Sequence, residues 1–164
     1  MRNQKLITQN HILEIQKTLE QNDAGYRRVP GTVLKNEFTG ETVFTPPQDY
    51  STILKLMNNL EKFINNPKMS DLDPLTKMAL LHFQFETIHP FYDGNCRTGR
   101  ILNILFLVQQ DLLDLPILYL SRFIIQRKAD YYRLLQEVRK MEIGKNGFCT
   151  CWMEYSKQQR KLLI

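Results

Sequence analysis

Hydrophobic positions recur every three or four residues along most of the chain, which is the spacing of one face of an α-helix. This pattern predicts amphipathic helices over residues 7–20, 49–64 and 73–88, followed by a more apolar helix over residues 97–110. Residues 121–139 continue the pattern, with a break between two helices expected at residues 129–132. The side chains expected to face the core are Ile53, Leu54, Met57, Leu60 and Phe63 in the second helix, and Met78, Leu81, Phe85 and Ile88 in the third.

The pattern changes between residues 30 and 44, where two short apolar runs flank polar residues. Residues 30–34 and 41–44 are joined through Asn36, Thr39 and Gly40, which are typical of a tight turn. We therefore expect a small β-hairpin at this place. The fold class that follows is all-α, with this hairpin as its β-structure.

Composition narrows the class of protein. The 164 residues are 43% hydrophobic and 24% charged, which suits one folded domain and excludes a disordered chain or a collagen. The longest apolar stretch, residues 101–108, is too short to cross a bilayer, and no signal peptide is visible. The three cysteines, an odd number, suit a reducing compartment. We expect a cytoplasmic protein without a membrane partner.

The net charge of +5 suggests nucleic acid as a partner. However, the Lys and Arg residues are spread over several predicted helices and are not interleaved with aromatic residues. A basic nucleic-acid-binding domain would show salt-sensitive DNA binding, and little in the sequence supports it.

The residues that carry chemistry stand between the third and fourth predicted helices. Residues 89–100, HPFYDGNCRTGR, form a polar loop that ends at a helix N-terminus, where N–H groups and the helix dipole favour an anion. Gly94 lets the backbone approach the anion closely, and Asn95 adds a side-chain donor. Arg97 and Arg100 are three residues apart, so they share a helix face and can bind further phosphate oxygens.

Two further residues of this loop suit catalysis. Asp93 is its only carboxylate and the candidate ligand for magnesium, which takes oxygen ligands alongside phosphates. His89 is the one side chain of the loop suited to take a proton from an incoming hydroxyl near neutral pH, as histidines commonly do. The alternative is a helix-capping loop with an ordinary buried histidine. We expect such a structural role for His11 and His82.

The loop resembles the signature of the Fic family (Fic/Doc superfamily), His-Pro-Phe-x-Asp/Glu-Gly-Asn-x-Arg-x-x-Arg, with every fixed position filled. The resemblance covers about residues 10–140 and includes residues 25–27, 30–31, 43–47, 79–88 and 118–122 in family order. It implies a Fic-type helical core in which the hairpin is a flap. It also implies a protein adenylyltransferase, which moves AMP from ATP to a Ser, Thr or Tyr hydroxyl of a protein and releases pyrophosphate. A minority of Fic proteins transfer other phosphate-linked groups.

Matched position by position, the family pattern implies a role for each residue of the loop. His89 is the general base, Phe91 is a core residue that fixes the loop, and Asp93 holds Mg²⁺ on the phosphates of ATP. The flap residues hold the target protein as an added strand. They are Thr42, Val43 and Phe44, and the residues implied to bind the nucleotide are Gly94, Asn95, Cys96, Arg97 and Arg100, with Tyr131 and Tyr132 bordering the adenine.

Cys96 departs from the family pattern, because glycine is commonest at this position. If the position needs a positive φ, a cysteine costs about 1 kcal/mol, and we expect reduced nucleotide binding that Cys96→Gly would restore. A thiol at a helix N-terminus is also expected to have a lowered pKa and to be oxidised easily.

Regulation is a second departure. Many Fic proteins carry an inhibitory helix whose Glu, followed by Gly or Asn, pairs with the second arginine of the motif, here Arg100. No Glu in this chain is followed by Gly or Asn. We therefore expect either an unregulated transferase or an inhibitor supplied in trans.

The third departure is the C-terminal tail, residues 141–164, which follows the expected Fic core of residues 1–140. Helical periodicity fades there, and residues 149–153 resemble nothing in the family. Residues 143–164 read in a shifted frame give a helix similar to the one that follows in Fic proteins. Our hypothesis is a frameshift near Met141 and a gene product truncated at both ends.

The leading interpretation is an adenylyltransferase whose partners are ATP, with Mg²⁺, and a protein substrate, the chain itself included. Cys96 and truncation are expected to impair its activity. The alternative is an inactive or weakly nucleotide-binding Fic remnant.

Overall fold

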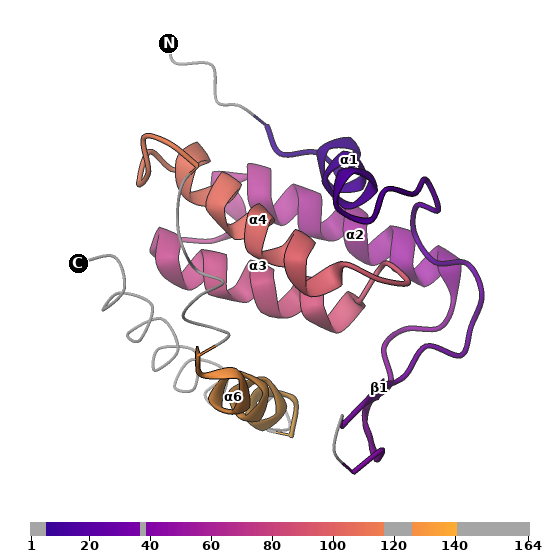
Figure 1. Cartoon of the computed structure of the whole chain (residues 1–164). Helices are drawn as coiled ribbons and strands as arrows, with labels where there is room; N and C mark the ends of the chain where they lie inside the picture. The colour runs from indigo at the N-terminus through magenta and orange to yellow at the C-terminus, as the bar shows by residue number, and fades with distance from the viewer. Residues whose placement is uncertain (1–5, 37–38, 117–125, 141–164) are drawn as a thin grey trace.

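The computed structural model describes residues 6–36, 39–116 and 126–140, and most of them form a helical bundle (Figure 1). Helices α2 (Tyr50–Asn65), α3 (Pro74–Ile88) and α4 (Asn95–Gln109) run side by side, with the short 3₁₀ helix η1 (Pro67–Met69) after α2. Helix α1 (Gln9–Glu20) packs against α4. The expected all-α fold with a small hairpin is confirmed.

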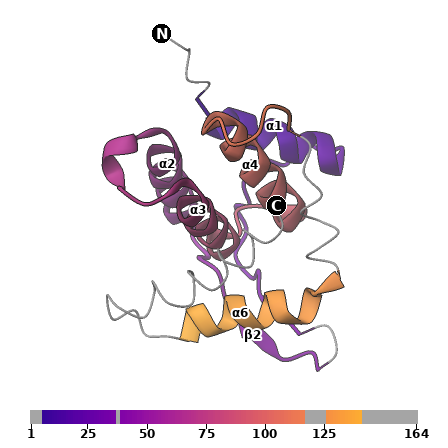
Figure 2. The same cartoon turned by 90° about the vertical axis from the view of Figure 1, so that its left-hand side faces the viewer.

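The hairpin consists of strands β1 (Leu34–Lys35) and β2 (Thr42–Phe44), which pair antiparallel. It projects from the bundle and lies beside helix α6 (Lys128–Lys140), as Figure 2 shows. The hairpin is therefore a flap attached to the bundle at one end, and α6 is the helix nearest to it.

Local sequence explains where α2 and α3 begin. The Asp49 carboxylate accepts a hydrogen bond from the Thr52 N–H at 2.8 Å, and the Asp73 carboxylate accepts from the N–H groups of Leu75 and Thr76. Both aspartates therefore cap N–H groups that lack a partner within the helix. Pro74, at the first position of α3, suits a helix start because its missing N–H costs nothing there.

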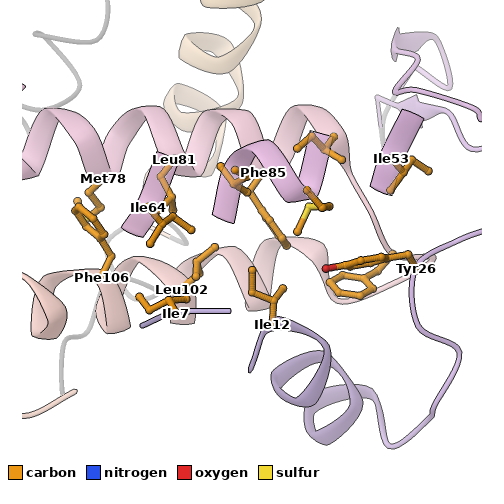
Figure 3. Packing of buried hydrophobic residues seen from close by; sticks show 14 of the residues in the cluster. Ile7, Ile12, Tyr26, Ile53, Ile64, Met78, Leu81, Phe85, Leu102 and Phe106 are labelled. Carbon is orange, nitrogen blue, oxygen red and sulfur yellow. The ribbon is translucent and has the colours of Figure 1, made fainter. Parts of the chain in front are cut away.

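The core lies between α2, α3 and α4, with a contribution from α1 (Figure 3). All four core residues predicted for α3 are buried, so that prediction is confirmed. The prediction for α2 is wrong at Leu54, which is 37% exposed, because α2 turns a narrow stripe towards the core. This stripe consists of Ile53, Met57, Leu60 and Ile64, and Phe63 packs at its edge.

Helix α6 packs on the other side of α3, in a second cluster of buried residues made by Ala79, Phe83, Tyr131, Leu135 and Val138. The helix break predicted at residues 129–132 lies slightly earlier, because Gln126 is helical, Arg127 is a turn residue and α6 begins at Lys128.

Two of the sequence predictions cannot be compared with the structure. Residues 117–125 and the whole predicted tail, residues 141–164, lie outside the described residues. Within residues 6–36, 39–116 and 126–140, no helix combines the length and the apolar character that crossing a membrane requires.

Candidate functional site

His89 marks the point where α3 ends and the loop to α4 begins. It is the C-terminal cap of α3, its N–H donates to the Phe85 carbonyl at 2.9 Å, and its backbone is left-handed, with φ 48° and ψ 60°. A left-handed backbone is uncommon for a residue other than glycine. The conformation at His89 therefore needs support from its surroundings.

Arg27 supplies this support from the segment that follows α1. Its Nε donates to the His89 carbonyl at 2.8 Å, and its Nη2 donates to the carbonyls of Ile88 and Pro47. The Arg27 N–H also donates to the Pro90 carbonyl at 2.9 Å. The side chain is only 1% exposed, and this burial lowers the arginine pKa. Sequence analysis noted residues 25–27 only as part of a resemblance and missed this clamp.

The loop itself is fixed by Asn95 and Phe91. The Asn95 Oδ1 accepts from the Phe91 N–H and the Asn95 Nδ2 donates to the Phe91 carbonyl, both at 2.9 Å. The Phe91 ring is fully buried beside Tyr26 and Phe85, with ring centroids 5.3 and 6.3 Å away. Asn95 was expected to add a side-chain donor to the anion, but its buried side chain instead fixes the loop by binding both backbone groups of Phe91.

The N-terminus of α4 follows directly. Gly94 is its cap, with a left-handed φ of 79°, and Asn95, Cys96 and Arg97 form the first helical turn. The N–H groups of such a turn have no acceptor within the helix, so they are available to an anion. Asp93 is exposed just before this turn, and its Oδ1 accepts from the Gly94 N–H at 2.7 Å.

The two arginines of the motif lie on α4 as predicted, one turn apart. Arg100 is partly buried, whereas the Arg97 side chain is 49% exposed. The Nη2 of Arg97 lies 2.6 Å from Oε1 of Glu20, the last residue of α1. Nothing in the motif indicated Glu20, since α1 is remote in sequence.

The predictions for Cys96 are wrong on two points. Cys96 is a helical residue and is not among the positive-φ residues, so the conformational cost does not arise. Its Sγ donates to the buried Glu86 carboxylate at 3.4 Å. Burial, with the adjacent Glu86 charge, raises the thiol pKa to about 12. These two effects outweigh the helix dipole on which the expectation of a lowered pKa was based.

Tyr131 and Tyr132 differ in position. Tyr131 is 6% exposed, and its hydroxyl lies 2.7 Å from Nε2 of His82 on α3. Tyr132 is 46% exposed, with the Lys128 ammonium 5.9 Å from its ring. Burial lowers the His82 pKa to about 4, so His82 is a neutral structural residue, as predicted. His11 is structural too, because its Nδ1 accepts from the Thr8 N–H at the start of α1.

A magnesium site built from protein side chains alone is absent from the described parts of the chain, where no three His, Cys, Asp or Glu residues form a group. Magnesium bound with a nucleotide needs only one or two carboxylates, because phosphates and water supply the other ligands. The exposed Asp93 before the α4 N-terminus suits an ion of this kind.

Comparisons with known proteins agree with this geometry. The family model described as the Fic/DOC family matches residues 6–107. A probable protein adenylyltransferase of Aquifex aeolicus is 31% identical over 102 residues, which are 62% of this chain and 31% of that protein. The protein adenylyltransferase Fic of Drosophila erecta is 28% identical over 145 residues, which are 85% of this chain and 28% of that protein.

Solved structures share the fold. A Fic family protein from Desulfovibrio desulfuricans superposes with a TM-score of 0.76 at 26% identity, over 95% of this chain and 46% of that one. A Fic domain containing signaling protein from Bacteroides thetaiotaomicron superposes with a TM-score of 0.75 at 22% identity, over 99% of this chain and 61% of that one.

A helical core with a hairpin flap and a complete loop between α3 and α4 defines a Fic-type domain. The chain belongs to the Fic/DOC family. It spans about a third of the length of the curated relatives named above, which are larger proteins.

Proposed function

We propose that the chain transfers AMP from ATP to a hydroxyl group of a protein. The observation that carries this proposal is that one segment, between α3 and α4, contains both a base and an anion site. The base is His89, at the end of α3, and the anion site is the first turn of α4, followed by Arg97 and Arg100 on the same helix. The relatives named protein adenylyltransferase support the same type of reaction.

His89 is the general base of the proposed reaction. Its imidazole takes the proton of a Ser, Thr or Tyr hydroxyl while that oxygen forms a bond to the α-phosphorus of ATP. The bond between the α-phosphorus and the bridging oxygen breaks, and pyrophosphate leaves with the electron pair. Arg27 serves this step indirectly, because its hydrogen bond to the His89 carbonyl holds the backbone that carries the imidazole.

The phosphates of ATP bind at the start of α4. The N–H groups of Asn95, Cys96 and Arg97 face them, and the guanidinium groups of Arg97 and Arg100 add charge-assisted hydrogen bonds. Asp93 is the carboxylate that holds Mg²⁺. When bound, this ion neutralises phosphate charge and stabilises the leaving pyrophosphate.

The target protein binds at the flap as a strand added to β2, which consists of Thr42, Val43 and Phe44. The Val43 carbonyl already accepts from Gln136 of α6, so the added strand pairs with other backbone groups of the flap. The adenine is bordered by Tyr132. Tyr131 suits this role less well, because it is buried against His82.

Incubation with Mg²⁺ and ATP labelled at the α-phosphate tests the proposal, with the chain's own hydroxyl groups as the first acceptors. We expect protein-bound label from the parent and from His11→Ala, a matched change outside the loop, and none from His89→Ala. Label at the γ-phosphate should not be transferred. Calorimetric binding of ATP without transfer by any variant would instead favour the nucleotide-binding remnant.

A further inference from the structure

Glu20 is an acidic residue placed at the proposed phosphate site by a helix outside the motif. It ends α1, its side chain is 11% exposed, and its Oε1 lies 2.6 Å from Nη2 of Arg97. Gln21, the next residue, is left-handed with φ 51° and ends the helix there. The carboxylate is thus carried by a fixed helix end that packs against α4.

The same carboxylate lies against the cap of α4. A Cβ atom placed on Gly94 would be 2.4 Å from Oε1 of Glu20 and 3.0 Å from its Cδ and Cγ. Glu20 is therefore held between the backbone at the helix start and the guanidinium of Arg97.

A carboxylate at this place could act in two opposite ways. It could compete with phosphates for Arg97 and for the N–H groups of the first turn, or it could orient Arg97 for them. In the described residues, Oε1 of Glu20 accepts no hydrogen bond from the Asn95 or Cys96 N–H, so it leaves these two N–H groups available to phosphates. The ion pair uses one nitrogen of Arg97, and Nη1 and Nε remain for a ligand.

We infer that Glu20 is a positioning residue for nucleotide binding, which rests on the function proposed above. It holds the long, half-exposed side chain of Arg97 in one orientation before ATP arrives. A binding site whose side chains are already ordered loses less conformational entropy when the ligand binds. This smaller entropy cost favours ATP binding, whereas repulsion between the Glu20 carboxylate and the phosphates opposes it. The positioning of Arg97 is the larger of the two effects.

Titration calorimetry with Mg²⁺·ATP on the full chain measures the ATP dissociation constant, which shows whether positioning or repulsion is larger. The variants are Glu20→Ala, which removes the contact, Glu20→Gln, which keeps an acceptor for Arg97 without the charge, and Glu14→Ala, an exposed glutamate on the same helix. We expect Glu20→Ala to weaken ATP binding about 2- to 10-fold, the effect of leaving one long side chain to be ordered by the ligand. Glu20→Gln should recover most of the loss, and Glu14→Ala should bind as the parent does.

If Glu20 acts through Arg97, the effect of removing Glu20 depends on the presence of Arg97. In an Arg97→Ala background, Glu20→Ala should change the ATP dissociation constant little, whereas a general loss of folding would weaken binding in both backgrounds. In the transfer assay, Glu20→Ala should raise KM for ATP and leave kcat unchanged.

The outcomes separate this inference from the proposed function. Unchanged or tighter ATP binding by Glu20→Ala overturns the positioning role alone, and tighter binding identifies a competing carboxylate. A parent chain that does not bind ATP overturns the proposed function, and the role of Glu20 with it.

Discussion

The side-chain amide of Gln136 in α6 donates a hydrogen bond to the backbone carbonyl of Val43 in the flap, at 2.9 Å. Leu34 pairs with Phe44 and Lys35 with Thr42, so Val43 is an extra residue in β2 with no partner in β1. An extra residue of this kind is a β-bulge, and its backbone groups are left out of the ladder. Gln136 therefore supplies a hydrogen-bond donor to the carbonyl of the bulge residue and joins the flap to the bundle.

Removal of this donor is expected to loosen the flap. Gln136→Glu keeps the shape of the side chain but cannot donate when ionised, whereas Gln136→Lys retains a donor. Hydrogen–deuterium exchange of residues 40–45 should be about 5-fold faster in Gln136→Glu, from the loss of about 1 kcal/mol. Gln136→Lys and Glu137→Gln, a charge change elsewhere on α6, should exchange at the parent rate. Equal rates in all four proteins would contradict a link between α6 and the flap.

The Asn95 side chain should be required for the loop to fold, because both of its hydrogen bonds are to the buried Phe91 backbone. Asn95→Asp has the same shape but cannot donate to the Phe91 carbonyl, and it places a carboxylate in a buried position. We expect a loss of about 1–3 kcal/mol in the free energy of unfolding by urea at pH 7. The exposed Asn58→Asp on α2 serves as the control and should lose little. A small loss for both would mean that the loop does not depend on Asn95.

The helical core and the loop were predictable because their signals are local. The four apolar residues of α3 repeat along one face, and residues 89–100 form one continuous segment. Arg27 was missed because its acceptor at His89 is 62 residues away in sequence. The wrong predictions for Cys96 have the same origin, since its pKa depends on Glu86 in the neighbouring helix and on burial that only the packed fold produces.

Cys96 is expected to react slowly with alkylating reagents, because burial and Glu86 raise its thiol pKa to about 12 and the thiolate is the reactive form. Mass spectrometric mapping of iodoacetamide-treated protein at pH 8 should show little modification of the Cys96 peptide until urea is added. Cys96→Gly should not raise ATP affinity, since no positive φ needs to be relieved. Rapid alkylation of the native protein, or tighter ATP binding by Cys96→Gly, would contradict this account.

His82 should make the protein less stable in acid. Burial lowers its pKa from 6.5 to about 4, so between these values the unfolded chain binds more protons than the folded one. The free energy of unfolding is therefore unaffected by His82 above pH 6.5 and decreases as the pH falls towards 4. The total decrease due to His82 is about 3 kcal/mol. His82→Gln, which can still bind the Tyr131 hydroxyl, should show a smaller loss in urea unfolding over this range. Carboxylates titrate in both proteins, so the difference between their curves of unfolding free energy against pH is due to His82. Parallel curves would show that His82 does not have a lowered pKa in the folded protein.

Gly94→Ala should destabilise the protein for two separable reasons. Its φ of 79° costs an alanine about 1 kcal/mol, and the new Cβ would lie 2.4 Å from Oε1 of Glu20. The flexible carboxylate can move away, but it then leaves Arg97, so we expect a total loss of about 2 kcal/mol.

The control is Gly25→Ala, because Gly25 has a similar φ of 64° and no atom within 4 Å of an added Cβ. In a Glu20→Ala background, Gly94→Ala should cost no more than Gly25→Ala does, since only the backbone strain remains. Urea unfolding of the four proteins that combine the Glu20 and Gly94 changes gives the coupling energy. Strict additivity would show that Glu20 does not contact Gly94 in solution.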